Sequence, residues 1–183
     1  MLRIVFALVL MLGAGPAMAT EAGWALLREG GHVVLLRHVI SGGGAEPANF
    51  DIEKCATQRN LSERGKQQAR KIGALFATRA APIERVLSSR WCRCLDTARI
   101  AFEAEPEVFE PLDPVKTDEA AKATQLKAIM DMAAGFAGSD NLVMVTHADV
   151  VQALTGVTPR EGEAVIVQPD GERLRVLGRI VFN

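Results

Sequence analysis

Residues 33–38 read VVLLRH, an apolar run rich in β-branched residues that ends in Arg37 and His38. A run of this kind, without polar alternation, predicts a strand that is buried on both faces. Residues 142–147 read LVMVTH, a second apolar run that ends in His147. Strands buried on both faces need a helical layer on each side, so these two runs predict an α/β fold.

Strand-like and helix-like segments alternate along the rest of the chain. We expect, in order, a helix that begins after the N-cap Ser62, a strand at 85–89, helices at 91–102 and 119–134, and a hairpin of 164–167 with 174–182 around a turn at 169–171. This order predicts a three-layer sandwich. Its central sheet is mostly parallel and flanked by helices, and an antiparallel hairpin joins it late in the chain.

The first residues have the pattern of a secretory signal peptide. Arg3 precedes an apolar core over residues 4–12, and small residues lead to an Ala-Met-Ala end at 17–19. The apolar core is shorter than the roughly 20 residues that a membrane-spanning helix needs. We therefore expect residues 1–19 to be removed, residues 20–183 to form one domain without a stable membrane anchor, and the protein to be periplasmic or secreted.

Composition excludes several classes of partner. The net charge is -1, and no block of basic residues favours nucleic acid or an anionic membrane surface. Repeats, low-complexity tracts and charged linkers are absent from the sequence, so a single domain that acts as a monomer is expected.

The sequence has three cysteines, Cys55, Cys92 and Cys94. The spacing of Cys92 and Cys94 is too tight for the usual zinc-binding pair, and an exported chain meets an oxidising compartment. One disulfide and one remaining thiol are expected. A link from Cys55 to either Cys92 or Cys94 would tie the loop before the first long helix to the segment that follows the second strand.

Polar groups that could carry chemistry follow the predicted strands. Arg37 and His38 end the first strand, His147 ends another, and residues 88–90 lead from a third toward Arg93. Ligands of open α/β sheets bind at the carboxyl ends of strands, so these groups are expected to meet at one edge of the sheet.

These segments resemble the histidine phosphatase superfamily, also called the phosphoglycerate mutase-like family. Its Arg-His-Gly motif corresponds to Arg37-His38-Val39, its Ser-Ser-x-x-x-Arg-x-x-x-Thr-Ala motif to residues 88–98, and its late histidine to His147. Residues 60–65, NLSERG, lie between the first two motifs as in the family. The resemblance covers nearly all of residues 20–183.

The resemblance implies a chemistry for each group. His38 would attack phosphorus and form a phosphohistidine, while Arg37 and Arg93 would hold the phosphoryl oxygens with planar guanidinium groups. His147 would bind a further phosphoryl oxygen, and Arg90 is a weaker candidate for substrate contact. Neither a metal nor another cofactor is expected, because the arginines supply the neutralising charge.

The sequence departs from the family pattern at two places. Val39 replaces the glycine that follows the nucleophile. The general acid also has no clear match. Asp113 is the first candidate, Asp118 and Glu119 follow it, and Asp149 is a rival because some members carry their acid next to the late histidine.

The expected function is metal-independent hydrolysis of a phosphomonoester, either a small molecule or an envelope component. The cysteines and the segment at 58–62 look similar to those of exported proteins that resemble lipopolysaccharide core heptose phosphate phosphatases, which suggests an envelope sugar phosphate. The alternatives are a phosphohistidine phosphatase, whose substrate needs less help from an acid, and a phosphate-binding protein of the same fold without turnover.

Overall fold

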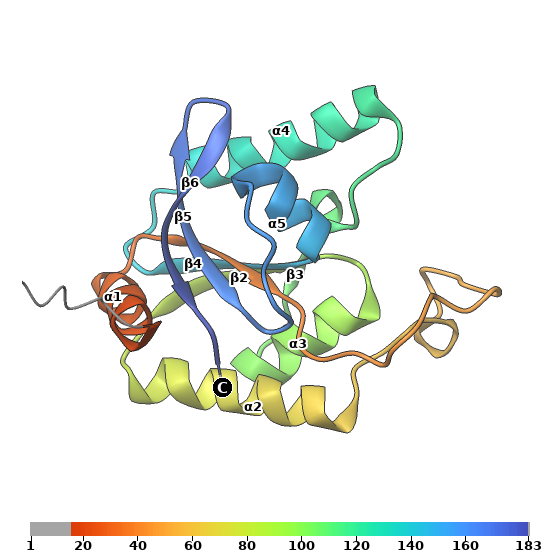
Figure 1. Cartoon of the computed structure of the whole chain (residues 1–183), viewed down its shortest axis with the longest axis horizontal. Coiled ribbons are helices and arrows are strands. Elements are labelled where there is room, and N and C mark those ends of the chain that lie inside the picture. Colours follow the sequence, from red (N-terminus) through yellow and green to blue (C-terminus); the bar gives the residue numbers. More distant parts are fainter. Residues whose placement is uncertain (1–15, 183) are drawn as a thin grey trace, which may run out of the picture.

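The computed structural model describes residues 16–182 (Figure 1). Most of the predicted signal peptide lies outside the described residues, and cleavage after Ala19 stays a prediction. Helix α1 (Pro16–Glu29) spans that cleavage point. None of the helices within residues 16–182 has the length and apolar character needed to cross a bilayer.

Six strands form one sheet in the order β3-β2-β4-β1-β5-β6. Their bounds are β1 (Val33–Arg37), β2 (Ile83–Ser88), β3 (Glu107–Val108), β4 (Asn141–Thr146), β5 (Ala164–Asp170) and β6 (Arg173–Ile180). Strands β1, β4, β2 and β3 pair in parallel, whereas β5 runs antiparallel to both β1 and β6. The predicted mixed sheet with its late hairpin is confirmed.

Helices cover both faces of the sheet, as the apolar runs predict (Figure 1). Alternate residues of β1 point to opposite sides, so Val34 and Leu36 pack with the helices α1, α2 (Glu63–Thr78) and α3 (Cys92–Phe102). Val33 and Leu35 pack on the other face with α4 (Glu119–Gly135) and α5 (Ala148–Thr155). The three-layer sandwich is therefore confirmed, and β1 lies in its middle layer.

The start of α2 is anchored to the segment that follows β1. Ser62 caps the helix by accepting a hydrogen bond from the Gly65 backbone N–H, as its position in the sequence predicts. Its own N–H and hydroxyl both donate to the carbonyl of Ile40. A Cβ atom on Gly65 would collide with that same carbonyl oxygen, so glycine is required there.

Three elements are not among those predicted. Helix α5 is short and holds the adjacent β-branched residues Val150 and Val151, which weaken a helical signal. Among the side chains described in α1, Trp24 and Leu27 are buried in the core and Leu26 packs against it, and β3 is two residues long. Two 3₁₀ turns, η1 (Cys55–Thr57) and η2 (Glu110–Leu112), complete the described elements.

The predicted turn at 169–171 lies one step further along the chain. Strand β5 continues through Pro169 and Asp170, which pair with Leu174 and Arg173 of β6. Pro169 is tolerated because β1 pairs with β5 only as far as Val167, so β1 has no carbonyl that would accept a hydrogen bond from the N–H that proline lacks. Gly171, at φ +62°, supplies the left-handed conformation that this tight turn needs.

Candidate active site

His38 lies directly after β1 and is held by backbone contacts. Its N–H donates to the carbonyl of Thr146 at the end of β4, which extends the pairing of the two strands. The ring Nδ1 lies 2.9 Å from the carbonyl oxygen of Val39, and a carbonyl only accepts, so Nδ1 carries the proton. The other nitrogen, Nε2, therefore has a free lone pair.

The imidazole ring of His38 is neutral, so its Nε2 atom is unprotonated. Burial, together with the charges of Arg93, Arg37 and Arg59, lowers the pKa of His38 from 6.5 to about 3, although the hydrogen bond to Val39 acts in the opposite direction. An imidazole in this state is unprotonated over the whole neutral range. It can act as a nucleophile without a base to activate it.

Three guanidinium groups surround the two histidines. Arg93 is 5% exposed on α3, and Arg37 and Arg59 are half-buried. The side-chain Nε of each is buried and has no hydrogen-bond partner within residues 16–182. The cluster therefore has positive charge and free N–H donors beside His38, which suits an anion with several oxygens.

His147 begins α5 at the end of β4, and its ring lies 5.5 Å from that of His38. Arg93 Nη2 is 3.4 Å from His147 Nδ1, and a guanidinium only donates, so Nδ1 accepts. His147 Nε2 then carries the proton and donates to the Ser89 hydroxyl at 3.0 Å. Burial lowers the pKa of His147 well below its usual value, with further lowering by Arg93, so this ring is also neutral.

Asp113 is brought to this network from η2. The Ser89 hydroxyl donates to Asp113 Oδ1 at 2.8 Å, and the backbone N–H of Arg90 donates to the same oxygen at 2.9 Å. The Nε–H of Arg90 donates to Asp113 Oδ2 at 2.8 Å. Both oxygens of this carboxylate, which is 3% exposed, thus accept hydrogen bonds from neighbouring groups.

Arg90 pairs with carboxylates. Besides Asp113, its guanidinium contacts Glu110 at 3.1 Å, and the hydrogen bond to Asp113 raises the pKa of Arg90. The structure thus brings Arg37, His38, Arg93 and His147 together, and joins Asp113 to them through Ser89. Arg90 lies behind Asp113.

The other candidates for the general acid have structural partners. Asp118 caps α4 by accepting from the Ala121 N–H, and the exposed Glu119 pairs with Lys122. Asp149 accepts from the backbone N–H groups of Val115 and Val150. None of the three has a hydrogen bond or ion pair with His38, Arg37 or Arg93.

Two residues of the cluster are missing from the sequence-based candidates. Arg59 precedes α2, and its charge lowers the pKa of both histidines. Glu46, in the loop after β1, accepts from Arg93 Nη1 at 2.8 Å and from the Arg59 backbone N–H at 2.9 Å. Arg59 is adjacent to the motif at 60–65, which could have drawn attention to it, whereas the surroundings of Glu46 show no pattern.

Trp91 supports Arg93 from one side. The Arg93 guanidinium lies over the Trp91 ring at 4.4 Å from its centroid, a cation–π contact. Phe50 stacks on Trp91 with the ring centroids 4.6 Å apart. Trp91 thus contacts both Phe50 and the Arg93 guanidinium.

Val39 occupies a position where glycine is not needed. It is fully buried in the core between the sheet and α1, α2 and α3. Its φ is not positive, and its N–H donates to the Thr97 hydroxyl at 3.2 Å. The departure from the family pattern therefore adds a packed side chain beside the nucleophile without straining the backbone.

A disulfide joins the exposed Cys55 to the buried Cys92, at a sequence separation of 37. Cys94 is free and buried, and burial raises the pKa of its thiol to about 12, so it stays protonated. The expected disulfide is present, and Cys92 is the partner of Cys55. Such a bond is typical of an oxidising compartment outside the cytoplasm.

We expect the Cys55→Ser variant to unfold more easily than the wild type. Opening a loop of this length should lower the free energy of unfolding by about 3 to 4 kcal/mol, mainly by freeing the unfolded chain. Urea denaturation without reductant measures the difference. Reductant should lower the free energy of unfolding of the wild type by the same amount and leave that of the variant unchanged. Equal stability of the oxidised wild type and the variant would contradict this account.

The lowered pKa of His38 predicts a loss of stability in acid. The unfolded chain binds a proton near pH 6.5 and the folded chain only near pH 3, so stability is full above pH 6.5 and falls as the pH drops toward 3. Between pH 7 and pH 4 we expect His38 to account for about 3 kcal/mol of that loss, at about 1.4 kcal/mol for each pKa unit.

The His38→Asn variant tests this, because an amide can keep the donor to Val39 without titrating. Urea denaturation at the two pH values should show a smaller difference for His38→Asn than for the wild type. His32, which is partly exposed and lies outside the cluster, provides the control variant His32→Asn. If His38→Asn and the wild type lose the same stability, His38 is not the group responsible.

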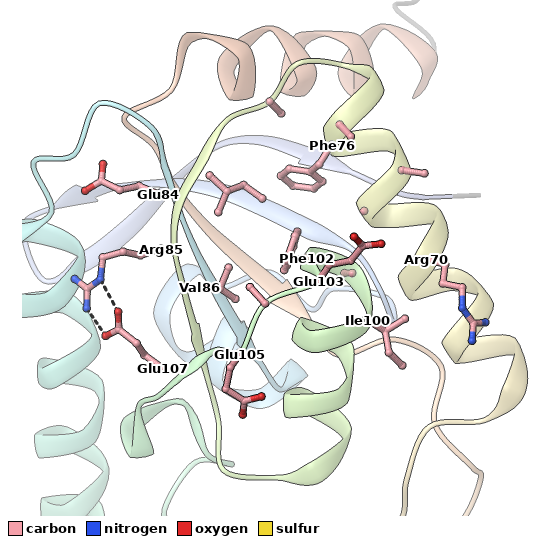
Figure 2. Close-up of a pocket in the computed structure, with 17 residues that line it drawn as sticks. Arg70, Phe76, Glu84, Arg85, Val86, Ile100, Phe102, Glu103, Glu105 and Glu107 are labelled. Atoms are coloured by element: carbon pink, nitrogen blue, oxygen red, sulfur yellow. Dashed lines mark hydrogen bonds and ion pairs between the residues drawn. The ribbon is translucent and has the colours of Figure 1, made fainter.

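A cavity of about 720 Å³ lies elsewhere, between α2, β2 and α3 (Figure 2). Phe76 and Phe102 point into it, and it is bordered by the amino end of β2. The candidate active site is at the carboxyl ends of β1 and β4, so the cavity is at the opposite edge of the sheet. None of the groups of the candidate site lines it.

Comparison with known proteins agrees with this arrangement. The family model of the histidine phosphatase superfamily (branch 1) matches residues 34–122, a segment that includes Arg37, His38 and Arg93. A comparison with curated protein sequences gives no significant match.

Solved structures share the fold. The protein histidine phosphatase SixA, complexed with tungstate, is 20% identical with a TM-score of 0.57, over 81% of this chain and 96% of that one. A phosphoserine phosphatase mutant from Entamoeba histolytica, in complex with phosphoserine, is 12% identical with a TM-score of 0.57, over 83% and 98%. A mycobacterial glucosyl-3-phosphoglycerate phosphatase is 15% identical with a TM-score of 0.56, over 82% and 98%.

At these identities the solved structures are informative about the fold alone, and the matched segment adds the arginine and histidine motifs. Over residues 34–122 the chain is therefore similar to the histidine phosphatase superfamily, and over most of its length it shares the fold of these solved structures.

Proposed function

We propose that the protein is a phosphatase that hydrolyses phosphomonoesters through a covalent phosphohistidine on His38. The observation that carries the proposal is a neutral imidazole with an unprotonated Nε2, set beside three guanidinium groups whose Nε–H donors have no hydrogen-bond partner within residues 16–182. Tetrahedral phosphoryl groups present several negative oxygens, which such a set of donors can hold while the lone pair of Nε2 attacks phosphorus.

The arginines would supply the charge neutralisation of the reaction. Negative charge spreads over the phosphoryl oxygens in the transition state, and fixed guanidinium groups in a buried site stabilise it without reorganisation. The Nδ1–H bond to the Val39 carbonyl keeps the His38 ring in one orientation and favours the positive charge that the ring gains on phosphorylation. The proposed reaction therefore does not depend on a metal ion.

We assign Asp113 a positioning role in place of the expected role as general acid. Its oxygens accept from Ser89 and Arg90, and Ser89 in turn accepts from His147. This chain fixes the tautomer in which His147 Nδ1 faces Arg93. To donate to a phosphoryl oxygen directly, His147 has to release Arg93 and take up a proton on Nδ1.

An envelope sugar phosphate remains the proposed substrate. The disulfide is typical of an oxidising compartment, where the predicted signal peptide would deliver the chain. Phe50 is 37% exposed on the loop that also carries Glu46, and it offers an apolar ring surface near the arginine cluster. The apolar face of a sugar ring would gain by packing on that surface.

A phosphohistidine phosphatase is the second candidate. The four carboxylates expected as general acids all have structural partners, and a phosphoramidate needs less protonation than an alkyl ester. A phosphate-binding protein without turnover would keep the arginine cluster and lose only the reaction.

Purified protein assayed against alkyl and aryl phosphomonoesters and a phosphohistidine peptide, with a chelator present, separates these functions. We expect release of phosphate from the monoesters at a rate that the chelator does not change. Hydrolysis of the phosphohistidine peptide alone would favour the second candidate. Binding of inorganic phosphate without hydrolysis of any substrate would overturn the proposed activity.

A further inference from the structure

Glu46 is a carboxylate that borders the arginine cluster and reaches solvent. Its side chain is 24% exposed on the loop between β1 and η1. Oε1 accepts from Arg93 Nη1 at 2.8 Å and lies 3.7 Å from Arg59 Nε, and Oε2 accepts from the Arg59 backbone N–H. The charged groups that face it come from α3 and from the segment before α2, and both are arginines.

Glu161 is the other carboxylate near the cluster, and its contacts differ. Its Oε1 accepts from both the N–H and the hydroxyl of Ser41, and it lies 3.9 Å from Arg37 Nη2. Glu161 thus has two hydrogen bonds, at 3.3 Å and 3.0 Å, that do not involve the arginines. Within residues 16–182, the hydrogen bonds and ion pairs of Glu46 with side chains are with the arginine cluster only, and a phosphoryl group that binds there competes for them.

We propose that Glu46 is the general acid of the reaction, an assignment that rests on the proposed function. Phosphoryl oxygens that bind Arg93 take the place of the Glu46 oxygen on that guanidinium. The displaced carboxylate then lies beside the substrate, with solvent on its other side. This is where the leaving alcohol has to depart.

The proton enters with the substrate, because a phosphomonoester bound as the monoanion carries one proton, which passes to Glu46. As the P–O bond breaks, its electron pair leaves with the alcohol oxygen, which takes the proton from Glu46. The lone pair of His38 Nε2 forms the N–P bond. In the second half, the Glu46 carboxylate takes a proton from water, the water oxygen bonds to phosphorus, and the N–P electrons return to His38. Glu46 then returns its proton to the departing phosphate.

The test is the dependence of Glu46→Gln on the leaving group. An alkyl ester such as glycerol 3-phosphate needs protonation of its leaving oxygen, whereas p-nitrophenyl phosphate releases a stable phenolate. We expect kcat for the alkyl ester to fall about 100- to 1000-fold and kcat for the aryl ester to fall less than about tenfold. Glu46→Asp should restore part of the alkyl activity, and Glu53→Gln, an exposed change on the same loop, should leave both rates unchanged.

Other outcomes would overturn the assignment. Equal losses on both esters with a raised KM would show that Glu46 only positions Arg93. Unchanged kcat with tighter binding of inorganic phosphate would show that Glu46 only competes with the substrate. Loss of alkyl activity in Glu161→Gln but not in Glu46→Gln would move the role to Glu161. A wild type that hydrolyses neither ester would instead contradict the proposed function itself.

Discussion

The His38→Ala variant is expected to lose phosphatase activity by roughly four to six orders of magnitude, as enzymes do when a covalent nucleophile is removed. No other histidine can replace it. His147 uses its two nitrogens for Arg93 and Ser89, and His32 is near Glu29 at the far end of β1. The loss should be in kcat, because the arginines that bind the phosphoryl group remain.

Reactions with labelled substrate, quenched in an alkaline denaturant that preserves a phosphohistidine, provide the measurement. The wild type should carry label in a linkage that is stable to alkali and labile to acid, as a phosphohistidine is, and His38→Ala should carry none. Circular dichroism and binding of inorganic phosphate show whether the variant is folded. Turnover within about tenfold of the wild type would refute the covalent mechanism, whatever the labelling shows.

The Arg93→Lys variant is expected to lower kcat/KM by about 100- to 1000-fold, although the charge is kept. The guanidinium of Arg93 points donors in three directions, with Nη1 at Glu46, Nη2 at His147 and a free Nε. An ammonium group on a flexible stem can replace one of these at most. It also loses the flat contact with the Trp91 ring.

Arg99→Lys is the matched control, because Arg99 is on the same helix and its guanidinium pairs with Glu105 on the exposed side. It should have kcat/KM within about twofold of the wild type. A similar result for Arg93→Lys would mean that charge alone suffices at this position, and it would contradict a role for the several donors of the guanidinium group.

The sequence predicts the parts of the site that follow buried strands. Residues 33–36 and 142–145 are apolar without interruption, and only a sheet covered on both sides accommodates such runs. The carboxyl ends of β1 and β4 necessarily meet at one edge of the sheet, so His38 and His147 had to be close to each other. The motif at 88–98 placed Arg93 near them in the same way.

The sequence does not predict the partners of residues on loops. Whether Asp113 faces a substrate or Arg90 depends on how η2 packs against β4, and no local pattern encodes that packing. Glu46 lies in a glycine-rich segment without periodicity, and it contacts Arg93 at a sequence separation of 47 residues. The sequence shows Val39 as a departure from the glycine of the motif. Whether its side chain fits depends on the packing of the sheet and helices around it, which the local sequence does not give.

The edges of the sheet limit self-association. An open sheet ends in strands whose free N–H and C=O groups can pair with another chain, and exposed charges and short strands are the usual protection. Strand β3 is two residues long, and β6 exposes Arg173, Arg175 and Arg179 along its length. A second copy approaching either edge would meet too few backbone groups at β3 and the exposed charges of Arg173 and Arg175 at β6, where Arg179 pairs with Glu163. Arginines thus have two separate places in this fold, one set gathered at the candidate active site and another along the edge strand β6, where exposed charge discourages aggregation.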